Sequence, residues 1–262
     1  MITDNLNLLF VGAADTGDIP SLKSLWQEAF GDSDGFVELF FKTAFSSERC
    51  RIIRADGEVA AALYILDCSV GEKKLAYIYA VATMEKYRGK GFCKKLMNDT
   101  HMFLAKGGYS AALLVPSEAS LFKFYSKIGY SISSEIAEAE VKASGETVAL
   151  RRIDKKEYAE LRKRYLPYNG VVQEGESLDF FESYASFYAG DDFLLAAFAD
   201  NSRLFGAELL GNASNLGGIL KTLECESGVF RMPDGERKRR FSMCISLDGT
   251  PLPELYFGLA FD

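Results

Sequence analysis

The segment 88–91, which reads Arg-Gly-Lys-Gly, has the residue types and spacing that most directly suggest chemistry. Its two glycines lack a Cβ, so the backbone can curve there and a phosphate group can approach it closely. Lys90, with Lys94 and Lys95 shortly after it, adds positive potential. If a helix begins just after this segment, its first backbone N–H groups lack helical acceptors and the positive end of its dipole lies at the same place. The segment therefore predicts a binding site for a pyrophosphate.

The residues on either side supply the strand and the helix that such a site needs. Residues 76–83 are rich in β-branched and aromatic side chains and contain no Gly or Pro, which predicts a strand. After the loop, apolar residues recur at three- and four-residue spacing, which predicts a helix with one apolar face ending at Gly107-Gly108. The apolar positions are Leu96, Met97, Phe103 and Leu104.

Two common phosphate motifs do not fit the loop. A dinucleotide fingerprint needs a third glycine where Lys94 stands, and a P-loop needs Gly-Lys-Ser/Thr, whereas Gly91 is followed by Phe92. The loop instead resembles the Gln/Arg-x-x-Gly-x-Gly/Ala segment of the GNAT superfamily, the acetyl-CoA-dependent N-acetyltransferases. Arg88 and Gly91 fill its first two positions, and Cys93 stands at the third. Taken alone, the loop is also compatible with an ordinary turn from strand to helix.

A second segment agrees with the same family in order and spacing. Residues 121–130 read Leu-Phe-Lys-Phe-Tyr-Ser-Lys-Ile-Gly-Tyr and follow a predicted strand at 111–115. This is similar to the family's later motif, a helix with Phe-Tyr followed by Gly-Phe or Gly-Tyr at the start of the next strand. Together the two motifs span residues 77–130.

The resemblance implies a place for acetyl-CoA as co-substrate. The pantetheine arm would pair with the strand edge at Val81, Ala82 and Thr83, and a backbone N–H near Val81 would polarise the thioester carbonyl. Tyr125 matches the tyrosine that protonates the departing thiolate; a phenol, with an ordinary pKa of about 10, keeps its proton at neutral pH. The alternative for Tyr125 is a core aromatic beside Phe124. The loop amides that would hold the phosphates are those of Arg88, Gly89, Lys90, Gly91, Phe92 and Cys93.

The chain departs from the family at the general base. Residues 74–77 contain no glutamate base, and residues 117–120, Ser-Glu-Ala-Ser, lack an asparagine that many members have there. Asp32 and Asp34 lie in a turn that often lines the acceptor side in the family, although turn aspartates also cap helices. A chain of waters is a further route for the amine's proton. His101, the one histidine, is interpreted as solvated or packed rather than catalytic.

The composition favours a folded protein that stays in the cytoplasm. The chain has 262 residues, of which 48% are hydrophobic, enough for one large or two modest domains. No apolar run approaches the roughly 20 residues that span a bilayer, and the first residues lack the basic start of a signal peptide. We therefore expect no membrane partner. The five cysteines show neither a zinc spacing nor a disulfide framework, so no metal is expected.

Charge argues against nucleic acid as a partner. The formal net charge is -7, whereas nucleic-acid-binding proteins carry basic surfaces. The local exception is the basic run at residues 236–240, beside Pro233-Asp234-Gly235. We interpret this run as the solvated flank of a turn; the alternative is a ligand patch.

The order of predicted elements in residues 1–145 is that of a GNAT domain, an α+β or α/β fold with a mixed central sheet flanked by helices. The predicted order is a strand, two helices, three strands, the loop with its helix, a strand, the helix of Tyr125 and the last strands. The strands are expected at 6–11, 50–54, 59–70, 76–83, 111–115 and within 131–143, and the first two helices at 18–30 and 36–41.

Beyond Ser144-Gly145-Glu146 the pattern restarts, so we expect residues 146–262 to form a second, degenerate GNAT-like domain. Its predicted elements are a strand at 148–150, helices from Asp154 and at 177–190, a hairpin at 193–210, a helix at 216–223, and strands near 229, at 241–247 and at 255–261. Where a phosphate loop would fall, residues 212–218 lack the Arg-x-x-Gly start. This half is therefore expected to bind no coenzyme. It would line the acceptor pocket or complete the core.

Three functions remain open at this stage. The favoured one is an acyltransferase that moves an acetyl group from acetyl-CoA to a primary amine on a small molecule or a peptide. The alternative is a non-catalytic acyl-CoA-binding sensor module, since a chain can keep the loop and lose its base. A purely structural protein would leave the Arg88 loop and the Tyr125 helix as coincidences.

Overall fold

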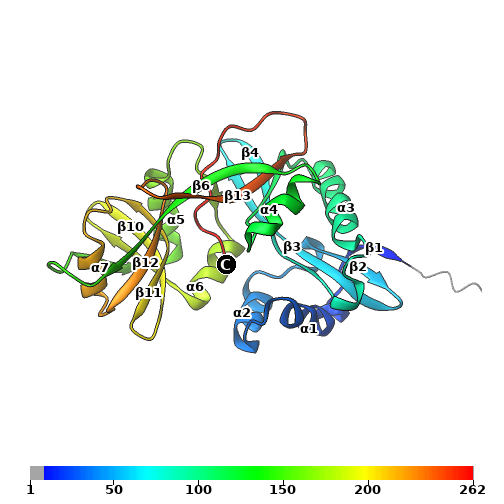
Figure 1. The fold of residues 1–262 in the computed structure, drawn as a ribbon, viewed down its shortest axis with the longest axis horizontal. Coiled ribbons are helices and arrows are strands. Elements are labelled where there is room, and N and C mark those ends of the chain that lie inside the picture. The colour runs from blue at the N-terminus through cyan, green and yellow to red at the C-terminus, as the bar shows by residue number, and fades with distance from the viewer. Residues whose placement is uncertain (1–8, 262) are drawn as a thin grey trace, which may run out of the picture.

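The first half alternates strands and helices in the predicted order in the computed structural model, which describes residues 9–261 (Figure 1). Part of the strand predicted at 6–11 lies outside the described residues. The strands are β1 (Phe10–Ala13), β2 (Cys50–Ala55), β3 (Glu58–Val70), β4 (Lys73–Thr83), β5 (Ala111–Leu114) and β6 (Ser131–Lys142). The α-helices are α1 (Ile19–Phe30), α2 (Asp34–Thr43), α3 (Phe92–Lys106) and α4 (Ala119–Ser126), and the 3-10 turns are η1 (Thr16–Asp18), η2 (Ser47–Arg49) and η3 (Glu85–Tyr87).

The second half largely repeats this order, without a counterpart of α4. Its strands are β7 (Leu150–Ile153), β8 (Val172–Gln173), β9 (Ser186–Gly190), β10 (Phe193–Asp200), β11 (Arg203–Gly211), β12 (Ser227–Met232) and β13 (Lys238–Ser246). Its helices are α5 (Lys155–Tyr165), α6 (Glu176–Tyr184) and α7 (Leu216–Thr222). The strand pairing repeats as well: β4 and β5 are parallel in the first half, and β11 and β12 are parallel in the second.

Two predicted elements of the second half are wrong. The helix expected at 177–190 ends at Tyr184, and Phe187 lies in β9, where Phe187 and Ala189 are buried and their neighbours are less so. The closely spaced aromatics suited a helical period, but residues 186–190 alternate with the period of a strand. The strand expected at 255–261 is an irregular tail with a single bridge, between Tyr256 and Gly170. The tail is held by its buried aromatic side chains rather than by a ladder of backbone hydrogen bonds.

The two halves share one sheet because each contributes a strand to the middle of it. The order is β1-β2-β3-β4-β5-β13-β6-β12-β11-β10-β9-β7, with β8 beside β3. Thus β13 pairs antiparallel with β5 and β6, and β6 pairs with β13 and β12. Figure 1 shows β6 and β13 running side by side between the two halves. The residues at 131–143, predicted to close the first half, therefore reach into the second; the division into 1–145 and 146–262 stays a prediction.

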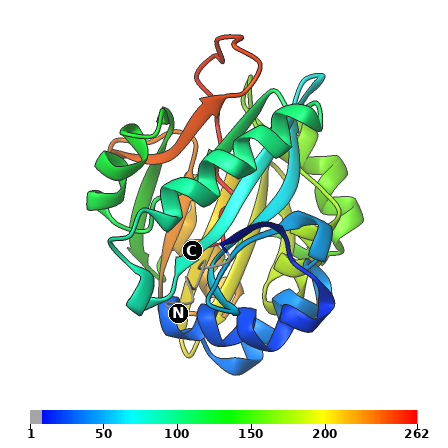
Figure 2. The same ribbon diagram turned by 90° about the vertical axis from the view of Figure 1, so that its right-hand side faces the viewer.

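Helices cover both faces of the first-half strands, because successive side chains of β4 are apolar and point to opposite faces of the sheet. Tyr77 and Tyr79 belong to a core with α1 and α2, and Ile78 belongs to the opposite core with α3 and α4. Trp26 of α1 is 1% exposed, and the first core continues into α5 and α6 of the second half. Figure 2 shows α3 lying across the strands. No helix among residues 9–261 combines the length and apolar character needed to cross a membrane.

A buried ion pair fixes α5 to β11 in the second half. The Arg162 guanidinium donates from Nε to Glu208 Oε2 at 2.6 Å and from Nη2 to Oε1 at 2.9 Å, and both side chains are almost fully buried. Arg162 Nη1 also donates to the Val171 carbonyl, and the Tyr158 hydroxyl donates to Glu208. Because each charge has several partners, the pair is tolerated in a low-dielectric core.

Candidate active site

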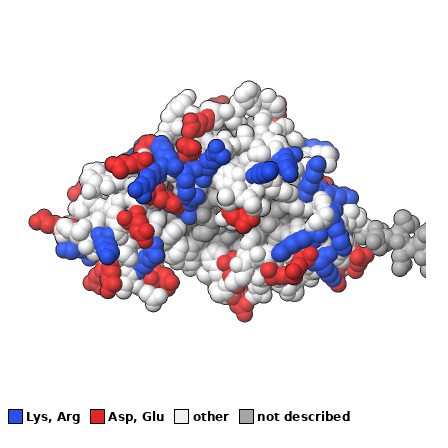
Figure 3. All heavy atoms as spheres, viewed as in Figure 1, with Lys and Arg blue, Asp and Glu red and all other residues white. Residues whose placement is uncertain are grey.

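A cavity of about 700 Å³ opens where β4 and β5 separate. The two strands pair only from Leu75 to Tyr77 and from Ala111 to Leu113. Beyond these residues the cavity is lined on one side by residues 78–81 and on the other by Leu114, Val115 and Ser117. Parallel strands that part in this way leave backbone groups on their inner edges, where an extended molecule can pair. Figure 3 shows the surface hollowed between the two halves, with most of the charged side chains around the hollow.

A bulge in β4 lies at this cavity. Tyr79 pairs with Tyr64 and Ala82 with Ala62, so Ala80 and Val81 together lie opposite a single residue of β3. Ala80 has a φ of 46°, a conformation that costs a non-glycine residue on the order of 1–3 kcal/mol. Ala80 and Val81 both line the cavity, whereas the next residue, Ala82, is buried in the core. Val81, near which the polarising N–H is predicted, therefore lies on the wall of the cavity.

The predicted phosphate loop has an open helix N-terminus. Gly91 is the N-cap of α3 with a φ of 78°, and no side chain caps it. Gly89 has a φ of 75°, and a Cβ added at either glycine would meet no atom within 4 Å. The Arg88 side chain donates from Nε to the Thr83 carbonyl at 3.1 Å, which ties the loop to the end of β4. The first N–H groups of α3 thus face open space and can receive an anion.

Aromatic and thiol side chains support this loop from inside. Tyr87 stacks on Phe92 with ring centroids 5.4 Å apart, and the Lys90 ammonium lies 5.0 Å from the centre of the Tyr87 ring. Cys93, which replaces the family's Gly or Ala, packs against the core shared by α3 and α4. Burial raises the pKa of the Cys93 thiol to about 11, so it is neutral at physiological pH. The larger residue is therefore accommodated by the core.

Tyr125 lies in α4 and lines the same cavity as Val81. Its side chain is mostly buried, and its ring packs edge-on against Phe124 and Tyr130. Burial, with a smaller contribution from Cys93, raises the pKa of the Tyr125 phenol above its ordinary value. The phenol therefore keeps its proton at neutral pH. The ring is part of the core and also reaches the cavity.

Of the two turn aspartates, only Asp32 lines the cavity. Its Oδ2 accepts a hydrogen bond from Trp26 Nε1 at 2.7 Å. Ser33, not an aspartate, caps α2, because its Oγ accepts from the Phe36 N–H. Asp34 accepts from the Gln27 side-chain amide and is not part of the cavity wall. The possibility that Asp32 caps a helix is therefore wrong.

His101 packs inside the protein, away from the cavity. It is half-buried on α3, and its Nε2 lies 2.9 Å from the Tyr130 hydroxyl. Burial lowers the pKa of His101 to about 4, so the ring is neutral at physiological pH and can accept the hydroxyl proton. It does not line the cavity, in keeping with the packed role expected of it.

The second half supplies much of the opposite wall of the cavity, one of the two roles that the sequence suggested for it, although the individual residues were not identified. The wall includes Tyr184 of α6, Phe198 of β10, Phe205 of β11 and Phe261 of the tail. No local pattern marked these residues individually, because only the folded arrangement of α6, β10, β11 and the tail brings them to one cavity.

The helix that corresponds to α3 in the second half is closed to a phosphate. Asn215 caps α7, since its Oδ1 accepts from the Gly218 N–H at 2.9 Å. A Cβ at Gly217 would lie 2.3 Å from Ser144 Oγ, so protein already occupies the space beside this turn. The N-terminus of α3 at Gly91 has no side-chain cap, whereas the N-terminus of α7 is capped by Asn215 and packed against Ser144.

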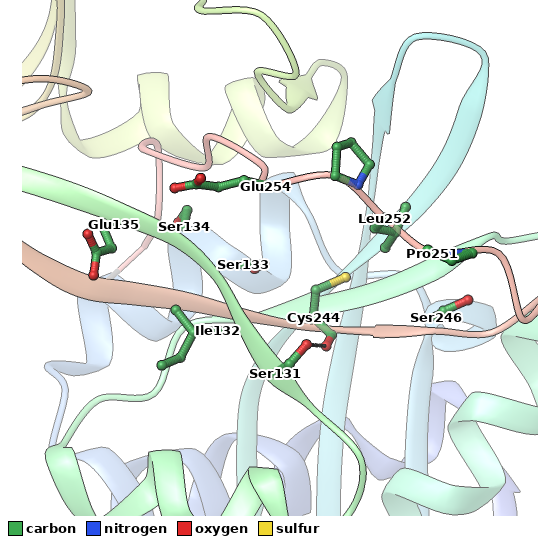
Figure 4. A pocket seen from close by; sticks show the side chains of 11 residues that line it. Ser131, Ile132, Ser133, Ser134, Glu135, Cys244, Ser246, Pro251, Leu252 and Glu254 are labelled. Atoms are coloured by element: carbon green, nitrogen blue, oxygen red, sulfur yellow. Dashed lines mark hydrogen bonds between the residues drawn. The ribbon is translucent and has the colours of Figure 1, made fainter.

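A separate cavity of about 690 Å³ lies beside β6 and β13 (Figure 4). It is lined by hydroxyl groups, by Glu135 and Glu254, and by the loop that follows β13. Ser131 Oγ donates to the Cys244 carbonyl across the two strands. None of the predicted coenzyme or catalytic residues lines this cavity. Of the predicted residues, Val81 and Tyr125 line the cavity at β4 and β5, whereas Gly91 lines a separate depression on α3 together with Lys94 and Lys95.

The comparison with protein families agrees with this geometry. Residues 11–133 match the model of the acetyltransferase (GNAT) domain, a range that includes the loop, the bulge and Tyr125. This part of the chain is a GNAT domain. No curated protein matches the chain. The GNAT match ends within β6, the first of the two strands that join the halves.

Solved structures extend the likeness over most of the chain. A GCN5-related N-acetyltransferase from Anabaena variabilis has a TM-score of 0.74 at 16% identity, with 92% of this chain and 73% of that chain covered. One from Kribbella flavida has a TM-score of 0.68 at 15% identity, with 91% and 71% covered. At these identities the likeness is one of fold: a mixed sheet flanked by helices, as predicted. The match of residues 11–133 to the acetyltransferase domain supports acyl transfer in general.

Proposed function

We propose that the chain is an N-acetyltransferase that moves an acetyl group from acetyl-CoA to a primary amine. The observation that carries this proposal is the single cavity lined by both the β4 bulge at Val81 and the Tyr125 ring. The open N-terminus of α3 begins at Gly91, shortly after β4 ends at Thr83. A thioester carbonyl and a departing sulfur can then meet their respective donors in one place.

The coenzyme would bind along β4 with its phosphates on the loop. The amides of residues 88–93 would hold the pyrophosphate, and the pantetheine arm would lie along residues 81–83 between the separated strands. The Val81 N–H would then donate to the thioester oxygen. A preorganised donor of this kind contributes about 3 kcal/mol to the stabilisation of the oxyanion.

Transfer would proceed by direct attack of the neutral amine on the thioester carbon. The nitrogen–carbon bond forms, the carbon–sulfur bond breaks, and the amine's proton leaves through water. Tyr125 would give its proton to the departing thiolate. Burial raises the pKa of Tyr125 and would also raise that of a thiol in the same cavity, so the phenol stays protonated until the departing thiolate needs a proton. The products are coenzyme A and the N-acetylated amine.

We also propose that one coenzyme binds per chain. The filled N-terminus of α7, beside Asn215 and Ser144, supports this stoichiometry. Titration of the whole protein with coenzyme A in a calorimeter is expected to give one site. Two equivalent sites would assign a second site to the other half.

Release of free thiol from acetyl-CoA in the presence of a panel of primary amines tests the proposal. Amine-dependent release, with the acetylated amine found by mass spectrometry, is the expected result. Calorimetric binding of acetyl-CoA without release for any amine would instead identify a non-catalytic acyl-CoA-binding module. A protein that binds no acyl-CoA would contradict both functions.

A further inference from the structure

We propose that the acceptor is a small primary amine on an apolar, ring-bearing body, bound by an aromatic wall built from both halves. This inference rests on the proposed acetyl transfer. It narrows the acceptor from any small molecule or peptide to one chemical class. The aromatic wall, the charge of the cavity and the volume of the cavity each favour this class of acceptor.

Aromatic rings form a continuous row across the boundary between the halves. Phe36 of α2 contacts Tyr184 of α6 with ring centroids 5.3 Å apart. Tyr184 contacts Phe198 at 5.9 Å, and Phe198 contacts Phe205 at 5.1 Å. All four rings line the cavity, and Phe36, Phe198 and Phe205 are only partly buried by the protein. Their uncovered faces provide apolar surface for a ligand.

Charge in the cavity is limited to one carboxylate. Among the described residues that line it there is no Lys, Arg or Glu, and the single Asp is Asp32. The Trp26 N–H donates to one oxygen of Asp32, which holds the carboxylate in place. An ammonium group is attracted both by a carboxylate and by the faces of aromatic rings. An acidic or phosphorylated acceptor would meet no cation here.

The wall also disfavours a polyhydroxylated amine. Each hydroxyl moved from water to an apolar surface without a new partner weakens binding. Among the described residues that line the cavity, Ser117 is the one side-chain hydroxyl besides the tyrosines. The cavity volume of about 700 Å³ lies within the usual 300–1,000 Å³ of ligand pockets, and the pantetheine arm would fill part of it, so the space left suits a small molecule. An amine with an aromatic or aliphatic body meets these conditions, whereas an amino sugar does not.

The test compares kcat/KM for four amines at saturating acetyl-CoA: 2-phenylethylamine, hexylamine, spermidine and glucosamine. We expect 2-phenylethylamine to exceed spermidine and glucosamine by about 30-fold or more, the factor expected from burying one ring. Equal or faster turnover of the two polar amines would overturn the inference and leave the proposed acetyl transfer intact. Absence of thiol release with every amine would overturn both.

A second arm separates an apolar acceptor from a longer acyl chain, which the same wall could receive. Hexanoyl-CoA replaces acetyl-CoA, with 2-phenylethylamine as the acceptor. If the wall binds the acceptor, kcat/KM for hexanoyl-CoA is lower than that for acetyl-CoA, because both apolar groups compete for the same space. A higher value for hexanoyl-CoA would assign the wall to the acyl group and overturn the inference.

Two pairs of variants link the preference to named residues. Asp32→Asn keeps an oxygen acceptor for Trp26 and is expected to raise KM for 2-phenylethylamine about 10-fold without changing KM for acetyl-CoA. Phe198→Leu removes a ring face but keeps apolar volume, and should reduce the preference for 2-phenylethylamine over spermidine. The matched controls are Asp34→Asn and Tyr168→Leu, since Asp34 lies off the cavity wall and Tyr168 is 94% exposed. Equal effects in variants and controls would contradict the assignment.

Discussion

Replacing either of two glycines on α3 by alanine separates coenzyme binding from backbone strain. Gly91 begins the helix with a φ of 78°, and Gly108 follows its other end with a φ of 76°. A Cβ at either position meets no atom within 4 Å, so the substitutions are alike in packing. Each places an L-residue in the left-handed region, which costs about 1–2 kcal/mol. Gly91→Ala and Gly108→Ala should therefore lose similar stability in urea denaturation.

Their effects on coenzyme affinity should differ. At Gly91 the added methyl group lies beside the N-terminal N–H groups of α3, where phosphate oxygens would approach. Lengthening one hydrogen bond to a charged phosphate costs about 1.5–3 kcal/mol, which raises Kd roughly 10- to 100-fold. Gly108 lies about 20 Å away, at the far end of a 15-residue helix, so its Kd should match the wild-type value.

Isothermal titration calorimetry with coenzyme A measures both affinities, and circular dichroism checks the fold. The reasoning is refuted if Gly91→Ala binds with wild-type affinity, or if Gly108→Ala weakens binding as much. In the first case the phosphates do not rest on this helix N-terminus. In the second case any loss of binding reflects stability rather than contact.

Three further predictions concern the acid, a buried histidine and the buried ion pair. Tyr125→Phe should keep its affinity for acetyl-CoA but lower the single-turnover rate of thiol release by about 10²- to 10⁴-fold; a wild-type rate would leave Tyr125 as a core residue only. Because burial lowers the pKa of His101 to about 4, from about 6.5 in the unfolded chain, stability present above pH 6.5 is lost as pH falls toward 4. Between pH 7 and pH 4.5 the free energy of unfolding measured in urea should fall by about 2 kcal/mol less in His101→Gln than in the wild type. The same fall in both proteins would contradict the assignment of this pH dependence to His101. Arg162→Met should destabilise the protein by about 3–5 kcal/mol in the same assay, and Arg162→Met with Glu208→Leu should restore much of it; a single variant as stable as the double one would show that the lone carboxylate carries no penalty.

Local patterns predicted most of the elements, because they depend on residues close in the chain. The apolar face of α3 and the cap at Asp154 follow from spacing and side-chain chemistry alone. At the start of α2 the sequence offered the turn aspartates as caps, whereas Ser33 between them is the cap. Residues 186–190 were mistaken for helix because clustered aromatics fit either period over a short stretch. The exchange of β6 and β13 had no local signal, since strand order depends on pairing partners about 100 residues apart.

The residues of the candidate site likewise fall into those that the sequence could predict and those that it could not. The loop and Tyr125 could be proposed because they are contiguous motifs, and the structure brings Tyr125 and Val81 to one cavity. Asp32 could not be distinguished from a helix cap until its contact with Trp26 was seen. Phe198 was predicted as an ordinary strand residue, because its place at the cavity depends on tertiary packing such as its contact with Tyr184 of α6.

The position of β13 has a consequence for synthesis on the ribosome. Among the described strands, β13 is the last to be made, yet its place in the sheet is between β5 and β6. Until residue 246 has emerged, the edge of β5 that faces away from β4 is unpaired, and β6 lacks one of its two neighbours. The first half therefore cannot complete its part of the sheet before the second half is made, unlike domains that fold in the usual N-terminal-first order. A nascent chain that stops before β13 exposes an unpaired strand edge, so the middle of the sheet closes only after strands of both halves have been made.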